Sequence, residues 1–476
     1  MISGKLISLL KVFSKYELNR LRKFLQSPYF NDQEDVSRLF DLINSALRKG
    51  DAAVALLDKE SIWKALYAKR KMDDAHLRRL ISDLNQLALH FLVQEARAKD
   101  PLGEALELQK VLEKPELKKH LSGVERQIQR HLEVEQGRSA QSYFVNFQLH
   151  WTIYNRASKT VAASDYVDKL LPADYYLEVF YVVQKLKFYV SWLIFRGFRA
   201  TPLELPMMPG FMEYLGNERF ARVPLIIIYQ NIILCLTKPE EERYFQNLIS
   251  DLKNYADNLT KEDIRECYHI AQNYCAFKIN QGKTEYYQEV FQIFKNIINL
   301  GILLEEEQLS EGVYKNIITT SLRVGEFEWA EAFIQEYSIH LPSDIRENAR
   351  TFNLANLYSH QKKYGNVIEL LRNVEYSDVV YALSAKLILI RTYFETDEFM
   401  ALDSLIDSFR IYIRRNKLIS NTLKTEYNNF LIFVKKLSTL PPNSPKMIER
   451  LRSQIERCNS VSSKKWLLEK IETYSR

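Results

Sequence analysis

A chain of 476 residues exceeds the usual size of a single hydrophobic core, so its length indicates two or three cores or one elongated array. The 13 glycines and 13 prolines together are about half of the usual share, which favours long helices with short connections and disfavours an all-β fold with many tight turns. The net charge of +6 is modest, and four cysteines without a CxxC pair exclude a disulfide framework.

The cellular compartment can be inferred from the same composition. So few cysteines suit a reducing compartment. The start of the chain carries Lys5 and Lys11 inside its apolar stretch and has no small-residue cleavage site, so it does not resemble a signal peptide. The most apolar run, residues 225–236, is too short to span a bilayer, and residues 176–195 contain two central lysines. We expect both segments to be buried helices of a cytoplasmic protein without a membrane span.

Residues 1–100 are predicted to form a compact N-terminal helical module. Ser14 and Glu17 have the spacing of a capping box, in which each side chain bonds a main-chain amide of the other residue. The helix that begins there should end near Ser27, because Pro28 disfavours α geometry in the residue before it.

Three more helices are expected in this module. Asn31 or Asp32 can cap the second helix, and the third and fourth are predicted over residues 60–67 and 74–98. The second and the fourth contain an apolar stripe at helical spacing, which indicates one buried face. A proline and a glycine at residues 101–103 mark a break in the chain. Residues 101–221 are predicted to form long helices that lead into the repeat array described next.

Residues 222–440 are predicted to be an array of paired helices. The pairs begin near Arg222, Asp263, Ser310, Ile345 and Val379, at spacings of 34 to 47 residues. A self-similar period in this range is typical of helical repeats, in which each unit buries its apolar face on its neighbours. The predicted fold is therefore all-α, with an α-α superhelix of helical hairpins after the N-terminal module.

The segment 314–342 resembles a tetratricopeptide repeat. Gly325 occupies the turn, Phe327 the aromatic position and Ala330 the small position where helices touch. Segments 348–374 and 383–409 resemble further copies, although segment 348–374 has Lys362 in its turn in place of glycine. The match covers about 100 residues through a degenerate motif, so it supports a fold more than a function.

The N-terminal module carries a second resemblance. The run from Phe13 to Leu18, followed by Phe24 to Asn31, is similar to the start of a group of bacterial proteins that have no assigned activity. Those chains also contain segments similar to residues 325–330. No catalytic or binding role can be transferred from this group.

The C-terminal end is basic. Residues 410–476 contain 15 basic and 5 acidic residues, a net charge of +10, so the rest of the chain carries −4. Residues 441–476 are predicted to form two short basic helices that cap the array. Arg410, Arg414, Arg415 and Lys417 form a candidate basic patch, either for nucleic acid or as a solvated surface.

Catalytic signatures are missing from the sequence. None of the eight histidines belongs to an HExxH motif or to a familiar zinc spacing, and no phosphate-binding loop or nucleophile elbow occurs. Cys267 and Cys275 are expected to be small core residues. We therefore predict no cofactor, no metal and no enzymatic activity.

The tetratricopeptide resemblance implies a binding groove lined by the first helix of each pair. Each of the three copies supplies residues spaced by four positions, which stand in a column on one helix face. These candidate groove residues are Lys315, Thr319, Arg323, Phe352, Asn356, His360, Leu387, Arg391 and Glu395. They either contact a partner or are merely solvated.

Three functions follow from these patterns. The leading hypothesis is a protein-protein interaction scaffold that binds a peptide or protein segment in the groove. The alternative is a nucleic-acid-binding repeat protein that uses the basic patch, and the third is an enzyme whose site is assembled from scattered residues. The sequence does not predict the partner or the oligomeric state.

Overall fold

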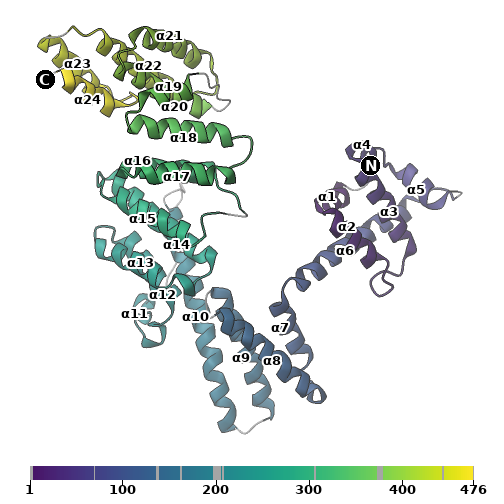
Figure 1. The fold of residues 1–476 in the computed structure, drawn as a ribbon. Coiled ribbons are helices and arrows are strands. Elements are labelled where there is room, and N and C mark those ends of the chain that lie inside the picture. Colours follow the sequence, from purple (N-terminus) through teal and green to yellow (C-terminus); the bar gives the residue numbers. More distant parts are fainter. Residues whose placement is uncertain are drawn as a thin grey trace. The chain divides into compact units, whose positions relative to one another are not determined.

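The computed structural model describes residues 4–68, 70–135, 139–160, 163–196, 205, 208–304, 307–372, 379–441 and 444–474. These residues form 24 α-helices with short connections, and no strand occurs among them (Figure 1). The predicted all-α class is confirmed. No helix in the described ranges is both long and apolar enough to cross a membrane. The chain divides into two compact units, residues 1–185 and 186–476, and α10 runs across the division.

The first part of unit 1 is a helical module with its own hydrophobic core. Leu21, Phe40 and Leu84 lie at its centre and have no exposed surface. The Ser14 hydroxyl accepts a hydrogen bond from the Glu17 amide at 3.2 Å, and the Glu17 carboxylate accepts one from the Ser14 amide at 2.8 Å, so the predicted capping box is confirmed. The helices are α1 Gly4–Val12, α2 Lys15–Leu25, α3 Glu34–Lys49, α4 Asp51–Ala55, α5 Lys59–Tyr67 and α6 Asp74–Ala98.

The predicted cap of the second helix was wrong. Helix α3 begins at Glu34, after Gln33, and has no side-chain cap. The Asn31 amide instead donates hydrogen bonds to the Leu25 carbonyl at 2.8 Å and to the Ser37 hydroxyl at 3.2 Å. Asn31 thus joins the end of α2 to the first turn of α3, because a turn asparagine satisfies whichever main-chain groups the tertiary structure brings near it.

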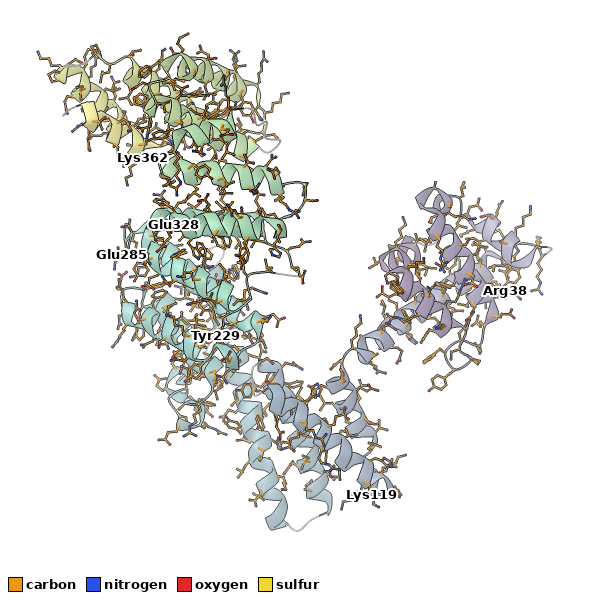
Figure 2. All side chains as sticks on the ribbon, in the orientation of Figure 1. Arg38, Lys119, Tyr229, Glu285, Glu328 and Lys362 are labelled. Atoms are coloured by element: carbon orange, nitrogen blue, oxygen red, sulfur yellow. The ribbon has the colours of Figure 1, made fainter. Side chains whose placement is uncertain are left out.

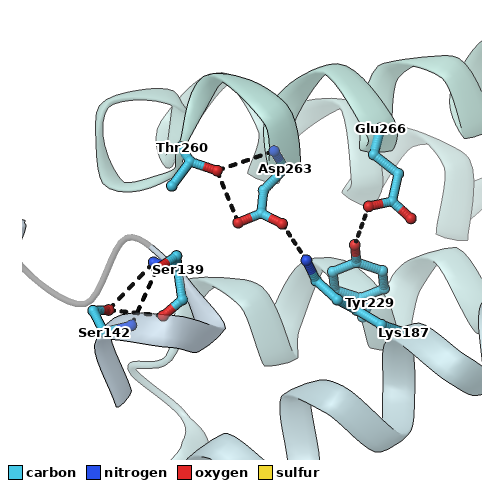
Figure 3. A network of polar contacts seen from close by, with 7 residues as sticks. All are labelled: Ser139, Ser142, Lys187, Tyr229, Thr260, Asp263 and Glu266. Atoms are coloured by element: carbon cyan, nitrogen blue, oxygen red, sulfur yellow. Dashed lines mark hydrogen bonds and ion pairs between the residues drawn. The ribbon is translucent and has the colours of Figure 1, made fainter. Parts of the chain in front are cut away.

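The second part of unit 1 consists of longer helices. Leu106, Ile128 and Leu149 belong to a small core shared by α7, α8 and α9. At the start of α9, the Ser142 amide donates to the Ser139 hydroxyl at 3.1 Å and the Ser142 hydroxyl donates to the Ser139 carbonyl at 2.7 Å (Figure 3). These helices are α7 Pro101–Val111, α8 Lys118–Glu135, α9 Ala140–Thr160 and α10 Ala163–Phe195.

Unit 2 is built from five helical hairpins in succession. In each hairpin the two helices pack on each other, and the hairpin packs on the next one along the chain. Each first helix begins within two residues of the position that the sequence pattern predicts. The pairs are α12 Pro224–Thr237 with α13 Glu242–Asn254, α14 Lys261–Asn280 with α15 Tyr286–Asn299, α16 Glu311–Val324 with α17 Phe327–Tyr337, α18 Arg346–His360 with α19 Tyr364–Leu371, and α20 Val379–Glu395 with α21 Phe399–Arg415.

Four further helices complete unit 2. The short α11 Phe211–Tyr214 precedes the hairpins, and α22 Asn421–Ser438, α23 Pro445–Arg457 and α24 Lys464–Tyr474 follow them. Helix α24 packs on α22 and α23, with Leu467 and Ile471 fully buried.

Four of the hairpins share one turn geometry. Gly282, Gly325, Lys362 and Asp397 each have a positive φ, between 55° and 92°. In every case the following amide donates a hydrogen bond to the carbonyl five residues earlier, as from Glu326 to Ser321 at 2.9 Å. This is the Schellman arrangement, which normally uses glycine in the left-handed position. In Figure 2, Glu285, Glu328 and Lys362 mark three of these turns along one edge of the stack.

The shared turn geometry gives a reciprocal prediction. We expect Gly325→Ala to destabilise unit 2 by about 1–2 kcal/mol, because a left-handed φ of 87° strains any residue with a Cβ. Asp397→Gly should stabilise it by about 0.5 kcal/mol, since Asp397 already bears this strain at a φ of 55°. Urea denaturation followed by circular dichroism measures both. As a control, Gly365→Ala on α19 should not destabilise, because its Cβ would meet nothing within 4 Å; an equal loss there would contradict the argument.

A buried polar network joins the C-terminal part of α10 to the first two hairpins (Figure 3). The Lys187 ammonium pairs with the Asp263 carboxylate, whose side chain is 7% exposed, and lies 5.7 Å from the centre of the Tyr229 ring. The Thr260 hydroxyl donates to Asp263 at 3.0 Å, and the Tyr229 hydroxyl donates to Glu266 at 3.2 Å. Lys187 lies inside the apolar segment 176–195, and its ion pair with Asp263 joins this segment to α14.

Cys267 and Cys275 lie in the core, as predicted. Cys267 and Cys275 are fully buried, and Cys235 is 2% exposed. Burial raises the pKa of the Cys235 thiol to about 12, so it remains a neutral thiol at physiological pH.

Candidate functional site

Unit 2 contains a large cavity of about 640 Å³ between α14, α15 and α16, which we call the large cavity. Its volume lies in the range of ligand pockets, roughly 300–1,000 Å³. Of the nine predicted groove residues, Thr319 lines it. The lining is Arg265, His269, Gln272, Asn273, Ala276, Ile279, Tyr287, Val290, Phe294, Ile297, Ile302, Leu303, Gln308, Leu309, Ser310, Val313, Asn316, Thr319 and Thr320.

The wall of the large cavity is apolar and held in position. Phe294 and Ile297 present the inner face of α15. The Arg265 guanidinium donates hydrogen bonds from α14 to the carbonyls of Ile302 at 3.0 Å and Leu304 at 3.3 Å. These bonds fix the segment that follows α15, so the cavity has a rigid apolar side.

The lining of the large cavity also includes amide groups. Asn273 on α14 and Asn316 on α16 are exposed and line the cavity. Nε2 of Gln272 is buried, and no hydrogen-bond partner for it occurs among the described residues. A lining that combines apolar side chains with side-chain amides can hold an apolar side chain and hydrogen-bond the main chain that bears it.

A second cavity of about 330 Å³, which we call the small cavity, lies at the ends of α18 and α20 beside α24. It brings together three of the predicted groove residues, His360, Arg391 and Glu395. Its lining is Ser359, His360, Lys362, Tyr364, Arg391, Thr392, Glu395, Trp466, Glu469 and Lys470.

Helix α24 borders the small cavity and donates two hydrogen bonds to Glu395 of α20. The Trp466 indole N–H donates to Oε1 of Glu395 at 2.9 Å, and the Lys470 ammonium donates to Oε2 at 2.6 Å. The Trp466 ring also packs on Phe394 and Phe430, with centroid distances of 5.3 and 6.1 Å. Both carboxylate oxygens of Glu395 are therefore occupied from within the chain.

The small cavity is electropositive around Arg391 and His360. Burial lowers the pKa of the Arg391 guanidinium, whereas Glu395 and Tyr364 act in the opposite direction. Burial also lowers the pKa of His360 from its ordinary value, and the charges of Arg391 and Arg323 lower it further. His360 is thus mostly neutral at physiological pH, beside cations that stay charged.

Arg323 lies on α16 close to the large cavity. It stands one turn beyond Thr319 of the large cavity, and its guanidinium lies 5.8 Å from the ring centre of Tyr287, which lines that cavity. Its charge also acts on His360 of the small cavity. The first helices α14 and α16 thus line the large cavity, and the first helices α18 and α20 line the small cavity.

Two predicted groove residues belong to the core instead. Phe352 is 4% exposed, and its ring meets that of Tyr381 at 5.0 Å, because the first turn of α20 covers this part of α18. Leu387 is partly buried against the same core. Lys315 and Asn356 are half-buried and line neither cavity.

The four residues of the predicted basic patch are all exposed, at the C-terminal end of α21 and just beyond it. Arg410 lies 3.7 Å from Asp407 one turn earlier. Arg414 and Arg415 occupy the last helical turn, where cations interact favourably with the helix dipole.

Sequence reasoning missed the residues that complete both cavities. Gln272 and Asn273 lie on a hairpin without the repeat motif, so nothing in the pattern marked them. Trp466 and Lys470 belong to a helix expected only to cap the array. A tryptophan within a short basic helix was the one available signal that α24 lines the small cavity.

The described helices of unit 2 form a stack of helical hairpins with two lined cavities. Comparison of the chain with family models, curated proteins and solved structures gives no match. The part of the chain that the structure describes contains no group of three or more His, Cys, Asp or Glu side chains placed to hold a metal ion.

Proposed function

We propose that residues 222–440 form a tetratricopeptide-like superhelix and that this protein is a non-enzymatic scaffold, which binds an extended segment of a partner protein on its first-helix surface. The observation that carries the proposal is the large cavity, whose lining combines apolar side chains with the amides of Gln272, Asn273 and Asn316. Four hairpins with the same turn support the repeat architecture.

The chemistry of the large cavity suits a protein segment. An extended chain alternates main-chain amides with side chains, so one apolar side chain can enter the cavity while Asn273 and Asn316 bond the neighbouring peptide groups. The rigid segment pinned by Arg265 lowers the cost of ordering the site upon binding. A cytoplasmic location is part of this proposal.

The proposal is tested by selecting peptides from a random display library on the full chain. We expect enriched peptides to share one large apolar residue, and Ala276→Phe, which fills the large cavity, to weaken their binding at least about tenfold in calorimetry, the loss of about one buried apolar anchor. Gln292→Phe places the same ring on an exposed position of α15 outside the cavity and should bind as the wild type does.

Two outcomes would reject the scaffold. One is a selection without enrichment, or with peptides that bind the Ala276→Phe variant equally well. The other is tight binding of nucleic acid whose affinity falls steeply with salt and depends on Arg410, Arg414, Arg415 and Lys417, which would establish the alternative function.

A further inference from the structure

The small cavity contains two hydrogen-bond donors that the protein leaves without acceptors. Nε of Arg391 and Oγ1 of Thr392 are buried, and within the described residues neither has a hydrogen-bond partner. Thr392 is 1% exposed, yet it lines the cavity beside Arg391. Buried polar groups are normally paired, so two adjacent orphans in a cavity wall indicate a site for a ligand with acceptor oxygens.

The charges around the small cavity select the ligand further. Arg391, Lys362 and Lys470 are its cations, and Glu395 and Glu469 are its carboxylates. Glu395 is matched by Lys470 at 2.6 Å, and Glu469 lies 3.9 Å from Lys465 outside the cavity. Lys465 is 88% exposed and screened by solvent, so the three cations and two carboxylates of the lining leave an excess of about one positive charge, which suits a monoanion better than the dianion of a phosphate group.

We propose that the small cavity binds a carboxylate, supplied by an acidic side chain of the partner segment whose apolar side chain occupies the large cavity. The carboxylate accepts from the Arg391 guanidinium and the Thr392 hydroxyl and replaces no bond within the protein. Arg323 on α16 lies 5.8 Å from the ring centre of Tyr287 at the large cavity, and its charge lowers the pKa of His360 at the small cavity. The inference rests on the proposed function and names the chemistry of the partner: an extended segment with one large apolar residue and one acidic residue.

His360 makes this binding pH-dependent. The cations that share the small cavity with His360 are Arg391 on α20, Lys362 in the α18–α19 turn and Lys470 on α24, and the charge of Arg323 on α16 also lowers the pKa of His360. The carboxylates in the same cavity are Glu395 and Glu469, and the Tyr364 hydroxyl is neutral. A bound carboxylate opposes the cations that lower the pKa of His360, so the bound state takes up a proton more readily. Affinity therefore rises as pH falls through the pKa of His360 in the bound state, and it is constant at higher pH.

The test uses capped amino acids as probes of the full chain, so it does not depend on the peptide selection. N-acetyl-glutamate methylamide should change the fluorescence of Trp466, and the matching glutamine probe should not. Trp466→Phe identifies the signal. Thr392→Val and Arg391→Gln should each weaken binding about tenfold, the loss of one charge-assisted or buried bond. Arg414→Gln, outside the cavity, should have no effect, and circular dichroism checks folding.

Further binding measurements on the same protein distinguish the possible sources of the anion. Capped glutamate should bind more tightly at about pH 5.5 than at about pH 7.5, and His360→Gln should remove this difference. Tighter binding of capped phosphoserine, or of N-acetylglycine with its free terminal carboxylate, would overturn the side-chain assignment. Equal binding by the Thr392→Val variant would overturn the site. Selected peptides that are indifferent to Arg391→Gln would refute this inference alone. A failed selection with intact glutamate binding would refute the scaffold, and with it the assignment of the carboxylate to a partner segment, but it would leave the carboxylate site standing.

Discussion

Replacing Asp263 by alanine is expected to destabilise the α12–α15 region by about 3 kcal/mol, the lower end of the range for breaking a buried ion pair. The substitution leaves the Lys187 ammonium without its partner, and the Lys187 side chain is only 21% exposed. The Tyr229 ring at 5.7 Å compensates part of the loss, since an aromatic face attracts a cation. Thr260 also loses an acceptor at the start of α14.

Urea denaturation, with hydrogen exchange of α14 to locate the effect, measures this loss. The double variant Lys187→Met/Asp263→Leu should remain within about 1 kcal/mol of the wild type, because apolar side chains of similar volume remove both charges at once. On the surface, Glu34→Ala, which breaks the exposed pair with Arg38, should cost less than about 0.5 kcal/mol. Equal losses in the single and double variants would show that packing, and not the orphaned charge, determines the effect.

Local signals in the sequence predicted most of the fold. The capping box at Ser14 needs only residues within one turn, and it forms as expected. The hairpins begin where the period placed them, because each is specified by its own apolar stripe and turn. Lys362 aligns with Gly325 in the repeat, and although the sequence marked it only as a departure from the motif, it adopts the same left-handed conformation.

The residues that the sequence could not place depend on distant neighbours. Lys278 is fully buried, and its ammonium lies 5.4 Å from the Tyr274 ring and 3.6 Å from Glu242, 36 residues earlier. Helical periodicity gives a lysine no reason to face inward. Phe352 shares a helix face with Asn356 and His360, but Tyr381 of the next hairpin covers it. Burial at these positions is decided by which helix packs above each turn.

The same dependence limited the prediction of the candidate site. His360, Arg391 and Glu395 were found because they belong to repeated positions of three aligned units. The partner of Glu395 comes from α24, more than 70 residues later, and no period relates the two. A repeat pattern therefore predicts the surface that every unit contributes, but it does not predict what a terminal helix places on that surface.

Replacing Phe409 by alanine is expected to cost about 3–5 kcal/mol, the usual effect of removing a fully buried aromatic ring. Phe409 on α21 has no exposed surface, and its ring lies 5.7 Å from that of Tyr427 on α22. In a stack of hairpins each unit depends on its immediate neighbours, so the loss should appear as faster hydrogen exchange in α20, α21 and α22. Helices α2, α3 and α6, whose core lies in unit 1, should exchange as in the wild type.

The matched control is Met400→Ala on the same helix. Met400 is 91% exposed, so its truncation should change stability by less than about 0.5 kcal/mol. If Phe409→Ala also accelerated exchange in α2–α6, the two units would unfold as one cooperative body, and stability would not be carried by nearest-neighbour contacts. Protection lost in α20–α22 alone would mean that each hairpin is stabilised by the next, and the surface from α14 to α16 would then keep its shape even when the end of the stack is weakened.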